Sequence, residues 1–398
     1  MIIMAQHVIT GDGRTLIEAG AAAITDGKIR DVGPAGEVTA RYPGESVVDY
    51  GEATILPGLF DMHVHLGYYY SQPDADRYDD FLIACYAAKQ AETALALGIT
   101  TVRDVSSPRH LCKQLRLAGE KGYLTVPRII HTDAGLCMTG GHGHGEASEE
   151  VDGADNIRAA IRRQRRDGAD WIKLLTSHRS SIPEYTQAEL EAAVDECHRR
   201  DIKIAVHAGT QPSIEMCINA GFDTIEHGTF MTVEQARRMA RNGQAWTPTI
   251  TAYTYLYEYC QKIKAEGGDL SNPVAAAAAR DFAYFEPAAR AYRDNFHELY
   301  MTGVTVLAGS DMVLYGAPPL PVNRELAYMV EYGITPLAAI RTATVNPAGV
   351  LGLAEVTGQL APGLEADILV VAGNAANDIT ALNQVRCVYL GGKAVYSS

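Results

Sequence analysis

The feature that most constrains the fold of this chain is a repeated alternation of strand and helix patterns between residues 54 and 308. Short runs of β-branched and apolar residues alternate there with longer helical stretches. The candidate strands are Thr54–Leu59, Thr100–Val105, Arg128–Thr132, Trp171–Leu175, Lys203–Val206, Thr224–Glu226, Ala245–Pro248 and Val304–Ala308. Eight β/α units in series predict an α/β fold, namely a (β/α)8 TIM barrel rather than a doubly wound sheet.

Both ends of the chain differ from this central block, because they show short strands joined by turns. Asp26-Gly27 and Gly391-Gly392 are hairpin signals, and Ala366–Val371 is a strand candidate. We therefore predict two domains. Residues 1–56 and 355–398 would form a small β-sandwich from both termini, and residues 57–354 would form the barrel.

The segment between the seventh and eighth candidate strands is unusually long. It carries Tyr253, Tyr255, Tyr257 and Tyr259, followed by an Ala-rich helical run from Val274. A long insertion after a barrel strand lies on the catalytic face, where it can act as a lid or specificity element. The alternative is an ordinary helical excursion or a contact between subunits.

The composition and net charge of the chain indicate which kinds of molecule it can bind. The chain has 398 residues, 47% of them hydrophobic, and a formal net charge of −14. This supports a large core, and the negative charge argues against nucleic acid or an anionic membrane as a partner. No apolar run reaches the roughly 18 residues of a membrane span. We expect a homo-oligomer that acts on a small-molecule substrate.

The cysteines and the N-terminus predict a cytoplasmic location. The seven cysteines are widely spaced, odd in number and form no CxxC pair, which is typical of reduced thiols rather than a disulfide framework or a zinc–thiolate site. Residues 1–11 lack the basic and apolar regions of a secretory signal peptide.

Candidate chemistry begins at His63 and His65, directly after the first predicted strand. Side chains at positions i and i+2 of a strand face the same way, so both imidazoles can reach one centre. Neutral imidazoles suit Zn²⁺ or a similar divalent ion. On its own, a His-x-His pair is a weak signal, because such pairs are more often surface residues.

Four further polar residues strengthen this signal, because each lies in or at the end of another predicted strand. They are Lys173, His207, His227 and Asp311. A lysine inside an apolar strand is costly to bury without a partner. The carboxyl ends of barrel strands meet at one rim, from which barrel active sites are built. The sequence therefore predicts a metal site there.

In combination these residues resemble the ligand pattern of the binuclear amidohydrolase superfamily. The approach Ile55–His63 is similar to its first-strand motif. Two C-terminal segments, Ala343–Ala348 and Gly358–Asp367, are similar to its return to the β-sandwich. The resemblance extends over nearly the whole chain, and its motifs are specific in combination.

The resemblance implies a role for each residue. His63, His65 and Asp311 would bind one divalent ion and His207 and His227 a second, with Zn²⁺ as the expected metal. Lys173, carboxylated by CO₂, would bridge the two ions. A hydroxide between the metals would attack the amide, with Asp311 as the general base and acid.

A glycine-rich stretch suggests the branch of the superfamily. Gly140-Gly141-His142-Gly143-His144 resembles a loop of the prolidase-like carboxypeptidases, the branch that includes Xaa-Pro dipeptidases and imidazolonepropionase relatives. The resemblance implies that His142 lies near the scissile carbonyl as a catalytic and substrate-binding residue. It also implies that Tyr253 binds a substrate carboxylate. Arg103-Asp104 is similar to the same branch.

The resemblance therefore predicts a zinc-dependent peptidase or dipeptidase that cleaves the amide bond of a dipeptide or an N-acyl amino acid. An alternative substrate is a non-peptide amide, a urea or a cyclic amide, as for imidazolonepropionase. Two other classes are a mononuclear deaminase, which does not use a bridging lysine, and a non-catalytic dihydropyrimidinase-related scaffold. Scaffolds of that kind typically lose metal ligands, whereas this chain keeps them.

Overall fold

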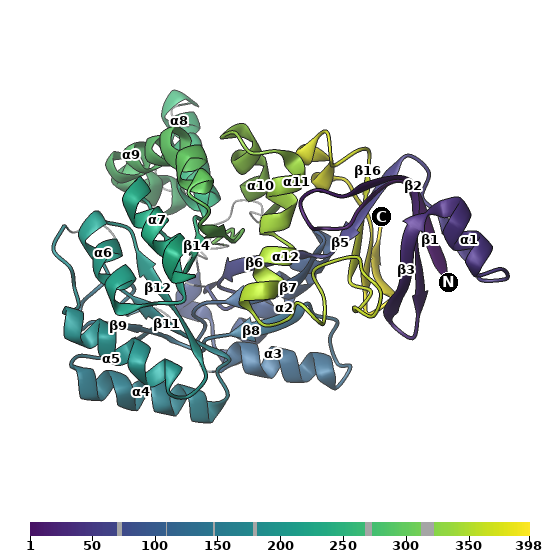
Figure 1. The fold of residues 1–398 in the computed structure, drawn as a ribbon. Helices are drawn as coiled ribbons and strands as arrows, with labels where there is room; N and C mark the ends of the chain where they lie inside the picture. Colours follow the sequence, from purple (N-terminus) through teal and green to yellow (C-terminus); the bar gives the residue numbers. More distant parts are fainter. Residues whose placement is uncertain (70–73, 109, 146–147, 178–180, 267–272, 312–321) are drawn as a thin grey trace.

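The computed structural model describes residues 1–69, 74–108, 110–145, 148–177, 181–266, 273–311 and 322–398. It is an α/β fold that contains parallel sheets flanked by helices, together with a third sheet built from both ends of the chain. In Figure 1 the two termini lie near each other at one end of the molecule. The parallel strands and most helices lie at the other end.

The terminal sheet has eight strands in the order β18-β17-β16-β5-β1-β2-β3, with β4 beside β1. Its strands are β1 (Ile2–Ile9), β2 (Leu16–Thr25), β3 (Lys28–Pro34), β4 (Val47–Asp49), β5 (Ala53–Pro57), β16 (Ile368–Ala372), β17 (Val385–Leu390) and β18 (Lys393–Ser397). The predicted turns at Asp26-Gly27 and Gly391-Gly392 join β2 to β3 and β17 to β18. The described strands form one sheet and do not show the two facing sheets of the predicted β-sandwich.

The parallel strands form two hydrogen-bonded sheets. One has the order β6-β7-β8, and the other has the order β10-β9-β11-β12-β13-β14-β15. The strands are β6 (Leu59–Val64), β7 (Ile99–Asp104), β8 (Arg128–His131), β9 (Gly135–Cys137), β10 (Ser148–Glu150), β11 (Trp171–Leu175), β12 (Lys203–Ala208), β13 (Thr224–His227), β14 (Ala245–Thr247) and β15 (Thr305–Val306). The short strands β9 and β10 were not predicted.

Helices follow most of the parallel strands. They are η2 (Ala75–Arg77), α2 (Asp80–Ala96), α3 (Leu111–Glu120), α4 (Ala154–Asp167), α5 (Gln187–His198), α6 (Gln211–Ala220), α7 (Val233–Asn242), α8 (Ile250–Glu266), α9 (Pro273–Met301), α10 (Val322–Glu331), α11 (Pro336–Thr342) and α12 (Val345–Val350). Two further helices lie beside the terminal sheet, α1 (Ala35–Arg41) and η3 (Ile379–Asn383). Helices α4 to α7 lie along the outside of the seven-stranded sheet (Figure 1).

The first predicted strand, Thr54–Leu59, is wrong in its boundaries. Residues 53–57 are β5 of the terminal sheet, and a separate strand, β6, begins at Leu59. Gly58 lies between the two strands, and its backbone packs so closely on Thr100 that a Cβ there would lie 2.1 Å from Oγ1 of Thr100. His63 therefore lies inside β6 rather than after a strand. The last predicted strand, Val304–Ala308, is also shorter, because Ala308 N donates to Thr342 O outside the ladder.

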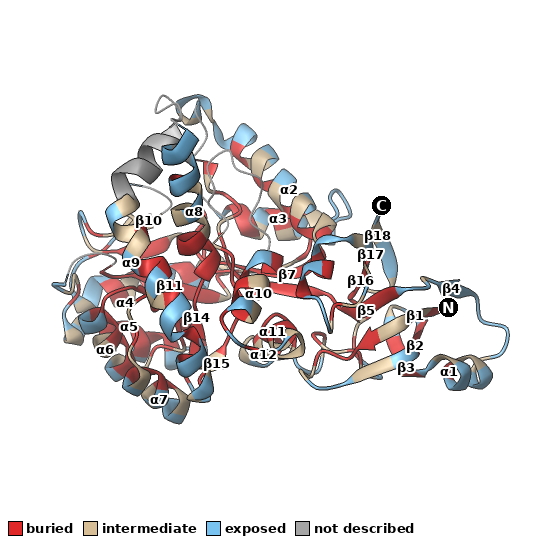
Figure 2. Ribbon diagram, turned by 90° about the horizontal axis from the view of Figure 1, so that it is seen from above, coloured by how far each residue is buried: buried red, intermediate tan, exposed pale blue. Residues whose placement is uncertain are grey.

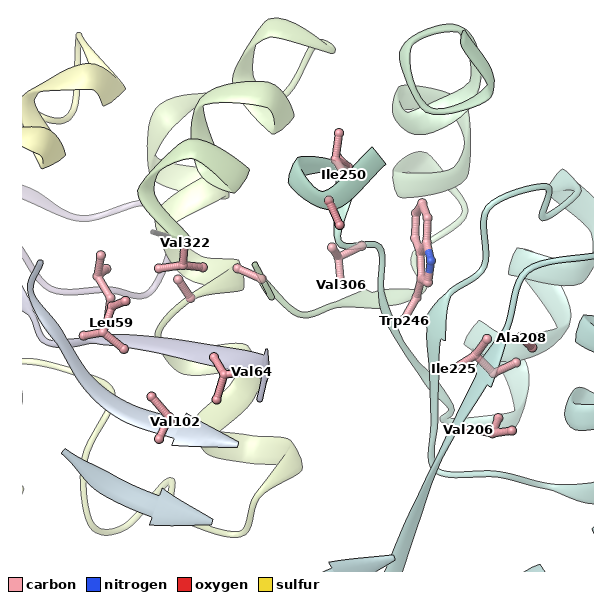
Figure 3. Close-up of a cluster of buried hydrophobic side chains, with 14 of the residues drawn as sticks. Leu59, Val64, Val102, Val206, Ala208, Ile225, Trp246, Ile250, Val306 and Val322 are labelled. Atoms are coloured by element: carbon pink, nitrogen blue, oxygen red, sulfur yellow. The ribbon is translucent and has the colours of Figure 1, made fainter. Parts of the chain in front are cut away.

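Most of the core of the parallel region is one large apolar cluster, and Met62, Ala245 and Leu307 form a small separate one. Figure 3 shows part of the large cluster, with Val64 of β6, Val102 of β7 and Val322 of α10 on one side of the view, Ile225 of β13 on the other, and Ile250 of α8 between them. The burial pattern in Figure 2 agrees with this: the strands are mainly buried, and the outer helices alternate between buried and exposed residues. No helix in the described ranges is both long and apolar enough to cross a lipid bilayer.

An ion-pair cluster joins the outer helices α4 and α5. The side chain of Glu196 is 2% exposed and accepts two hydrogen bonds from Arg162, Nε to Oε1 and Nη2 to Oε2, each of 2.9 Å. Arg200 donates to the same carboxylate. These hydrogen bonds outweigh the effect of burial and lower the pKa of Glu196 to about 2.

Glu196→Gln is expected to lower the free energy of unfolding at pH 7 by about 1–2 kcal/mol, because the arginine partners are partly exposed and screened. The folded-state pKa is lowered, so this stabilisation is present above pH 4.5 and is lost as the pH falls towards 2. Urea unfolding of both proteins at pH 7 and at pH 4 measures the difference. Equal stabilities at pH 7 would contradict this account of the cluster.

Candidate active site

The strands place apolar and charged side chains on opposite faces. In β11, Ile172 and Leu174 belong to the apolar core, whereas Lys173 lies between them in the sequence and points to the other face. In β12, Val206 is in the core and His207 follows it. Side chains alternate between the two faces of a strand. The alternation that places apolar residues in the core therefore places the polar residues together on the opposite face.

His63, His227 and Asp311 form a compact group of possible metal ligands, whose ligand atoms all lie within 4.8 Å of one another. Oδ1 of Asp311 lies 3.6 Å from Nε2 of His63 and 3.3 Å from Nε2 of His65. These residues come from β6, from the end of β13 and from the segment after β15. The predicted ligands His63, His65, His227 and Asp311 thus meet at one place.

The imidazole rings continue this group in a row. The ring centroids of His63 and His227 are 4.8 Å apart, and those of His227 and His207 are 4.3 Å apart. His142 lies beyond them, with its ring centroid 4.1 Å from that of His207. The structure therefore brings the rings of His207 and His142 next to those of His63 and His227.

Hydrogen bonds fix the orientation of three of these rings through their Nδ1 atoms. His63 Nδ1 lies 2.9 Å from Oε2 of Glu226, and His65 Nδ1 lies 3.1 Å from the carbonyl oxygen of Ser106. His227 Nδ1 lies 2.7 Å from Oγ1 of Thr249, whose own proton is directed to the carbonyl of Pro248. All three acceptors require Nδ1 to carry a proton, so each neutral imidazole keeps a lone pair on Nε2.

Lys173 is 1% exposed, and its Nζ atom has no hydrogen-bond partner among the described residues. Burial lowers the pKa of Lys173 to about 8, although the charges of Glu226 and Asp311 act in the opposite direction. An amine with a lowered pKa is more often uncharged, and the uncharged amine is the form that reacts with CO₂. The predicted position of Lys173 beside the other candidates agrees with these electrostatic contacts.

Asp311 keeps its negative charge at neutral pH. Burial raises its pKa, but the facing imidazoles of His63, His65 and His227 lower it more, and the net result is a pKa well below the usual range. Burial lowers the pKa of His63 to about 4, so this ring is neutral. Burial also acts to lower the pKa of His65, but its hydrogen bond with Asp311 produces a net rise.

The backbone at this site is unusual in two ways. His227 and Asp311 both have left-handed backbone conformations, with φ of 66° and 52°, which residues other than glycine rarely adopt. Gly309, two residues before Asp311, packs directly on β6: a Cβ there would lie 2.8 Å from Cβ of His63. The close packing at Gly309 and the turned backbone bring Asp311 against the histidines of β6.

Residues 54–395 match the amidohydrolase family. The chain belongs to the amidohydrolase family. It is therefore a hydrolytic enzyme that acts on amide bonds, and the predicted superfamily is confirmed.

Several proteins are similar to this amidohydrolase. Ochratoxinase of Aspergillus niger is 28% identical over 437 residues, which cover 98% of this chain and 86% of that protein. A Xaa-Pro dipeptidase crystallised with methionine in its active site has a TM-score of 0.85 at 29% identity, covering 100% of this chain and 99% of the other. Imidazolonepropionase of Haloarcula marismortui is 32% identical over 156 residues, or 37% of this chain and 36% of that protein.

Sequence reasoning missed one charged network of this amidohydrolase. The carboxylate of Glu226 is 0% exposed and binds both Nδ1 of His63 and Nη2 of Arg103, the latter at 2.7 Å. Arg103 is also 0% exposed and donates from Nε to the carbonyl of Met62. A glutamate directly before His227, inside a short apolar strand, was the available signal.

Two predicted residues of the substrate site differ in their surroundings. Half-buried His142 follows β9, where its backbone N–H donates to Oε2 of Glu184. Tyr253 lies in α8, is 3% exposed, and its ring centroid is 5.7 Å from that of His227. It also packs against Tyr292 of α9, with ring centroids 5.5 Å apart.

Proposed function

We propose that this amidohydrolase is a metal-dependent enzyme that cleaves the amide bond of a dipeptide or an N-acyl amino acid. The observation that carries the proposal is the convergence of His63, His227 and Asp311, whose possible ligand atoms all lie within 4.8 Å of one another. The similarity to a Xaa-Pro dipeptidase over the full length of both chains supports the substrate class.

The donor set suits two divalent ions, and members of this family are generally binuclear. We propose that His63, His65 and Asp311 hold one ion, and that His207 and His227 hold the second. Lys173, carboxylated by CO₂, would bridge them. The partnerless buried Nζ of Lys173 supports this bridge, because carboxylation replaces a costly buried amine with oxygen ligands. Imidazole and carboxylate donors favour zinc.

Bound zinc would supply Lewis acidity, which polarises a carbonyl and lowers the pKa of water. Asp311 then accepts a proton at a carboxylate oxygen from the attacking water and returns it to the leaving amine. His142 donates a hydrogen bond to the scissile carbonyl. The phenol hydroxyl of Tyr253 donates a hydrogen bond to a substrate carboxylate. Burial raises the pKa of Tyr253 well above its usual value, so the phenol stays protonated and can act as the donor.

We further propose that the two parallel sheets form the wall of one (β/α)8 barrel. Two hydrogen bonds support closure at one junction: Met62 N donates to Ala308 O at 2.9 Å, and Asp311 N donates to His63 O at 2.8 Å. At the other junction, Asp170 N donates to His131 O at 2.9 Å. In this proposal residues 57–354 form the barrel domain, and residues 1–56 and 355–398 form the terminal domain.

Purified enzyme supplied with zinc is expected to bind about two ions per chain and to release amino acid from dipeptides or N-acyl amino acids. Elemental analysis measures the first quantity, and a screen for amine release measures the second. Removal of the metal with a chelator should abolish turnover, and added zinc should restore it. Fewer than about one ion per chain after supplementation would contradict the binuclear proposal.

A hydrogen bond between Tyr253 and a substrate carboxylate can be tested with a double-mutant cycle, in which wild type and Tyr253→Phe are each measured with a free-acid and an amidated substrate. Tyr253→Phe should lower kcat/KM for the free acid. The expected loss of transition-state stabilisation is about 1.5–3 kcal/mol, the strength of a charge-assisted hydrogen bond. The same substitution should have little effect on a substrate whose C-terminus is amidated, because both changes remove one interaction. Strictly additive losses would instead favour a neutral amide, urea or cyclic amide as the substrate.

A further inference from the structure

Glu325 of α10 places a fully buried carboxyl group against the first turn of α8. Its Oε1 accepts a hydrogen bond from Ile250 N at 2.9 Å. Its Oε2 accepts one from Thr251 N and one from Thr251 Oγ1, each at 2.7 Å. The side chain is 0% exposed. A helix start usually takes its cap from the residue just before it, whereas this cap comes from 75 residues away.

The capped turn is directly attached to the active site. Thr249, the residue before Ile250, has a left-handed φ of 52° and contacts Nδ1 of His227 through its hydroxyl at 2.7 Å. That hydroxyl accepts from the imidazole because its own proton goes to the carbonyl of Pro248 at 2.7 Å. A shift at the start of α8 would therefore move the acceptor that orients His227.

The same helix carries Tyr253 one turn later. Its ring contacts the ring of His227 from the α8 side. The hydroxyl of Tyr292 in α9 donates to the carbonyl of Pro248 at 2.8 Å, so the turn before α8 is held from a second helix as well. The position of Tyr253 along α8 thus depends on where the helix begins.

We infer that Glu325 is a positioning residue of this amidohydrolase, which fixes the start of α8 and, through Thr249, the orientation of His227. The inference rests on the proposed role of His227 as a metal ligand. Burying a carboxyl group costs free energy, which the hydrogen bonds from Ile250 and Thr251 offset. A leucine could fill the same space, but it could not accept hydrogen bonds. The donors of Ile250 and Thr251 need a side chain in which both terminal oxygens are acceptors.

Glu325→Gln tests the inference with almost no change of volume. The amide nitrogen cannot accept a hydrogen bond, so at least one donor of the α8 turn loses its partner. Loss of a residue that orients a metal ligand typically lowers metal affinity by about 10–100-fold. We expect a loss of this size in zinc affinity, measured by competition with a chelator, together with a similar loss in kcat/KM.

Three further variants make the result specific. Thr249→Val removes the hydroxyl beside His227, and its combination with Glu325→Gln should lose little more than the larger single loss, because both act through one contact. Thr251→Val removes one donor and should give a smaller loss in the same direction even if Glu325→Gln folds poorly. Glu196→Gln is the control, because Glu196 is a buried carboxylate on α5, outside the proposed site. This variant should lose stability and keep its zinc affinity.

Zinc affinity and kinetics of Glu325→Gln and Thr251→Val equal to wild type would overturn the role of Glu325 while leaving the proposed function intact. Losses of Glu325→Gln and Thr249→Val that multiply in the double variant would also overturn it. A wild-type enzyme that binds no zinc would overturn both proposals, so the two failures are distinguishable.

Discussion

Asp311→Asn is expected to lower kcat by about 10²–10⁴-fold, the range that general acid–base catalysis contributes. The amide keeps the size of the side chain and one oxygen, but it cannot accept and return a proton. In the wild-type enzyme the facing imidazoles hold the pKa of Asp311 well below its usual range, so the side chain is a deprotonated carboxylate at neutral pH, the form that a general base requires.

Steady-state rates at saturating zinc separate loss of chemistry from loss of metal. Circular dichroism and thermal unfolding of Asp311→Asn should resemble those of wild type, because the side chain is 15% exposed and the substitution is nearly isosteric. Asp294→Asn is a matched control, since this residue lies on the exposed side of α9 and pairs with neighbouring Arg293. Wild-type turnover by Asp311→Asn would remove its assignment as the proton carrier.

The second large effect is expected at Lys173. Lys173→Ala should lose most bound metal and, with it, activity, because the proposed bridge between two ions disappears. A short-chain carboxylic acid such as propionate should restore part of both, since its oxygens can occupy the space left by a carbamate. Metal content and amine release are measured with and without propionate.

Lys203→Ala provides the control for this experiment. Lys203 begins the neighbouring strand β12, is exposed and donates to the carbonyl of Val350. Its removal should leave metal content unchanged, and propionate should have no effect on it. If Lys173→Ala keeps two ions and full activity, Lys173 has no bridging role, and the buried amine requires another explanation.

Some parts of the fold depend on short-range interactions, and these are the parts that a short stretch of sequence can predict. The helix starts at Thr186 and Thr232 are capping boxes in which a side chain three residues ahead completes the cap. The turn at Asp26-Gly27 depends on backbone conformations that these two residues favour. In each case the residues that make the contact are adjacent, so a short stretch of sequence contains the whole interaction.

The division between β5 and β6 shows where this reasoning fails. Residues 53–64 form one apolar stretch, and their local preferences do not separate a strand of the terminal sheet from a strand of the parallel sheet. The separation occurs at Gly58, where the backbone packs on Thr100 and Gly58 N donates to Asp367 O. Those contacts join segments that are distant in the sequence.

The sequence by itself determined which side chains can bind a metal at the strand ends, because alternation along a strand places His63 with His65 and separates Lys173 from its apolar neighbours. Only the tertiary structure decided what surrounds them. Glu226 meets His63 across 163 residues, and Glu325 reaches Thr251 across 74. The physical reason is that a buried charge needs partners within hydrogen-bond distance, and the choice of partner depends on which strands and helices pack together.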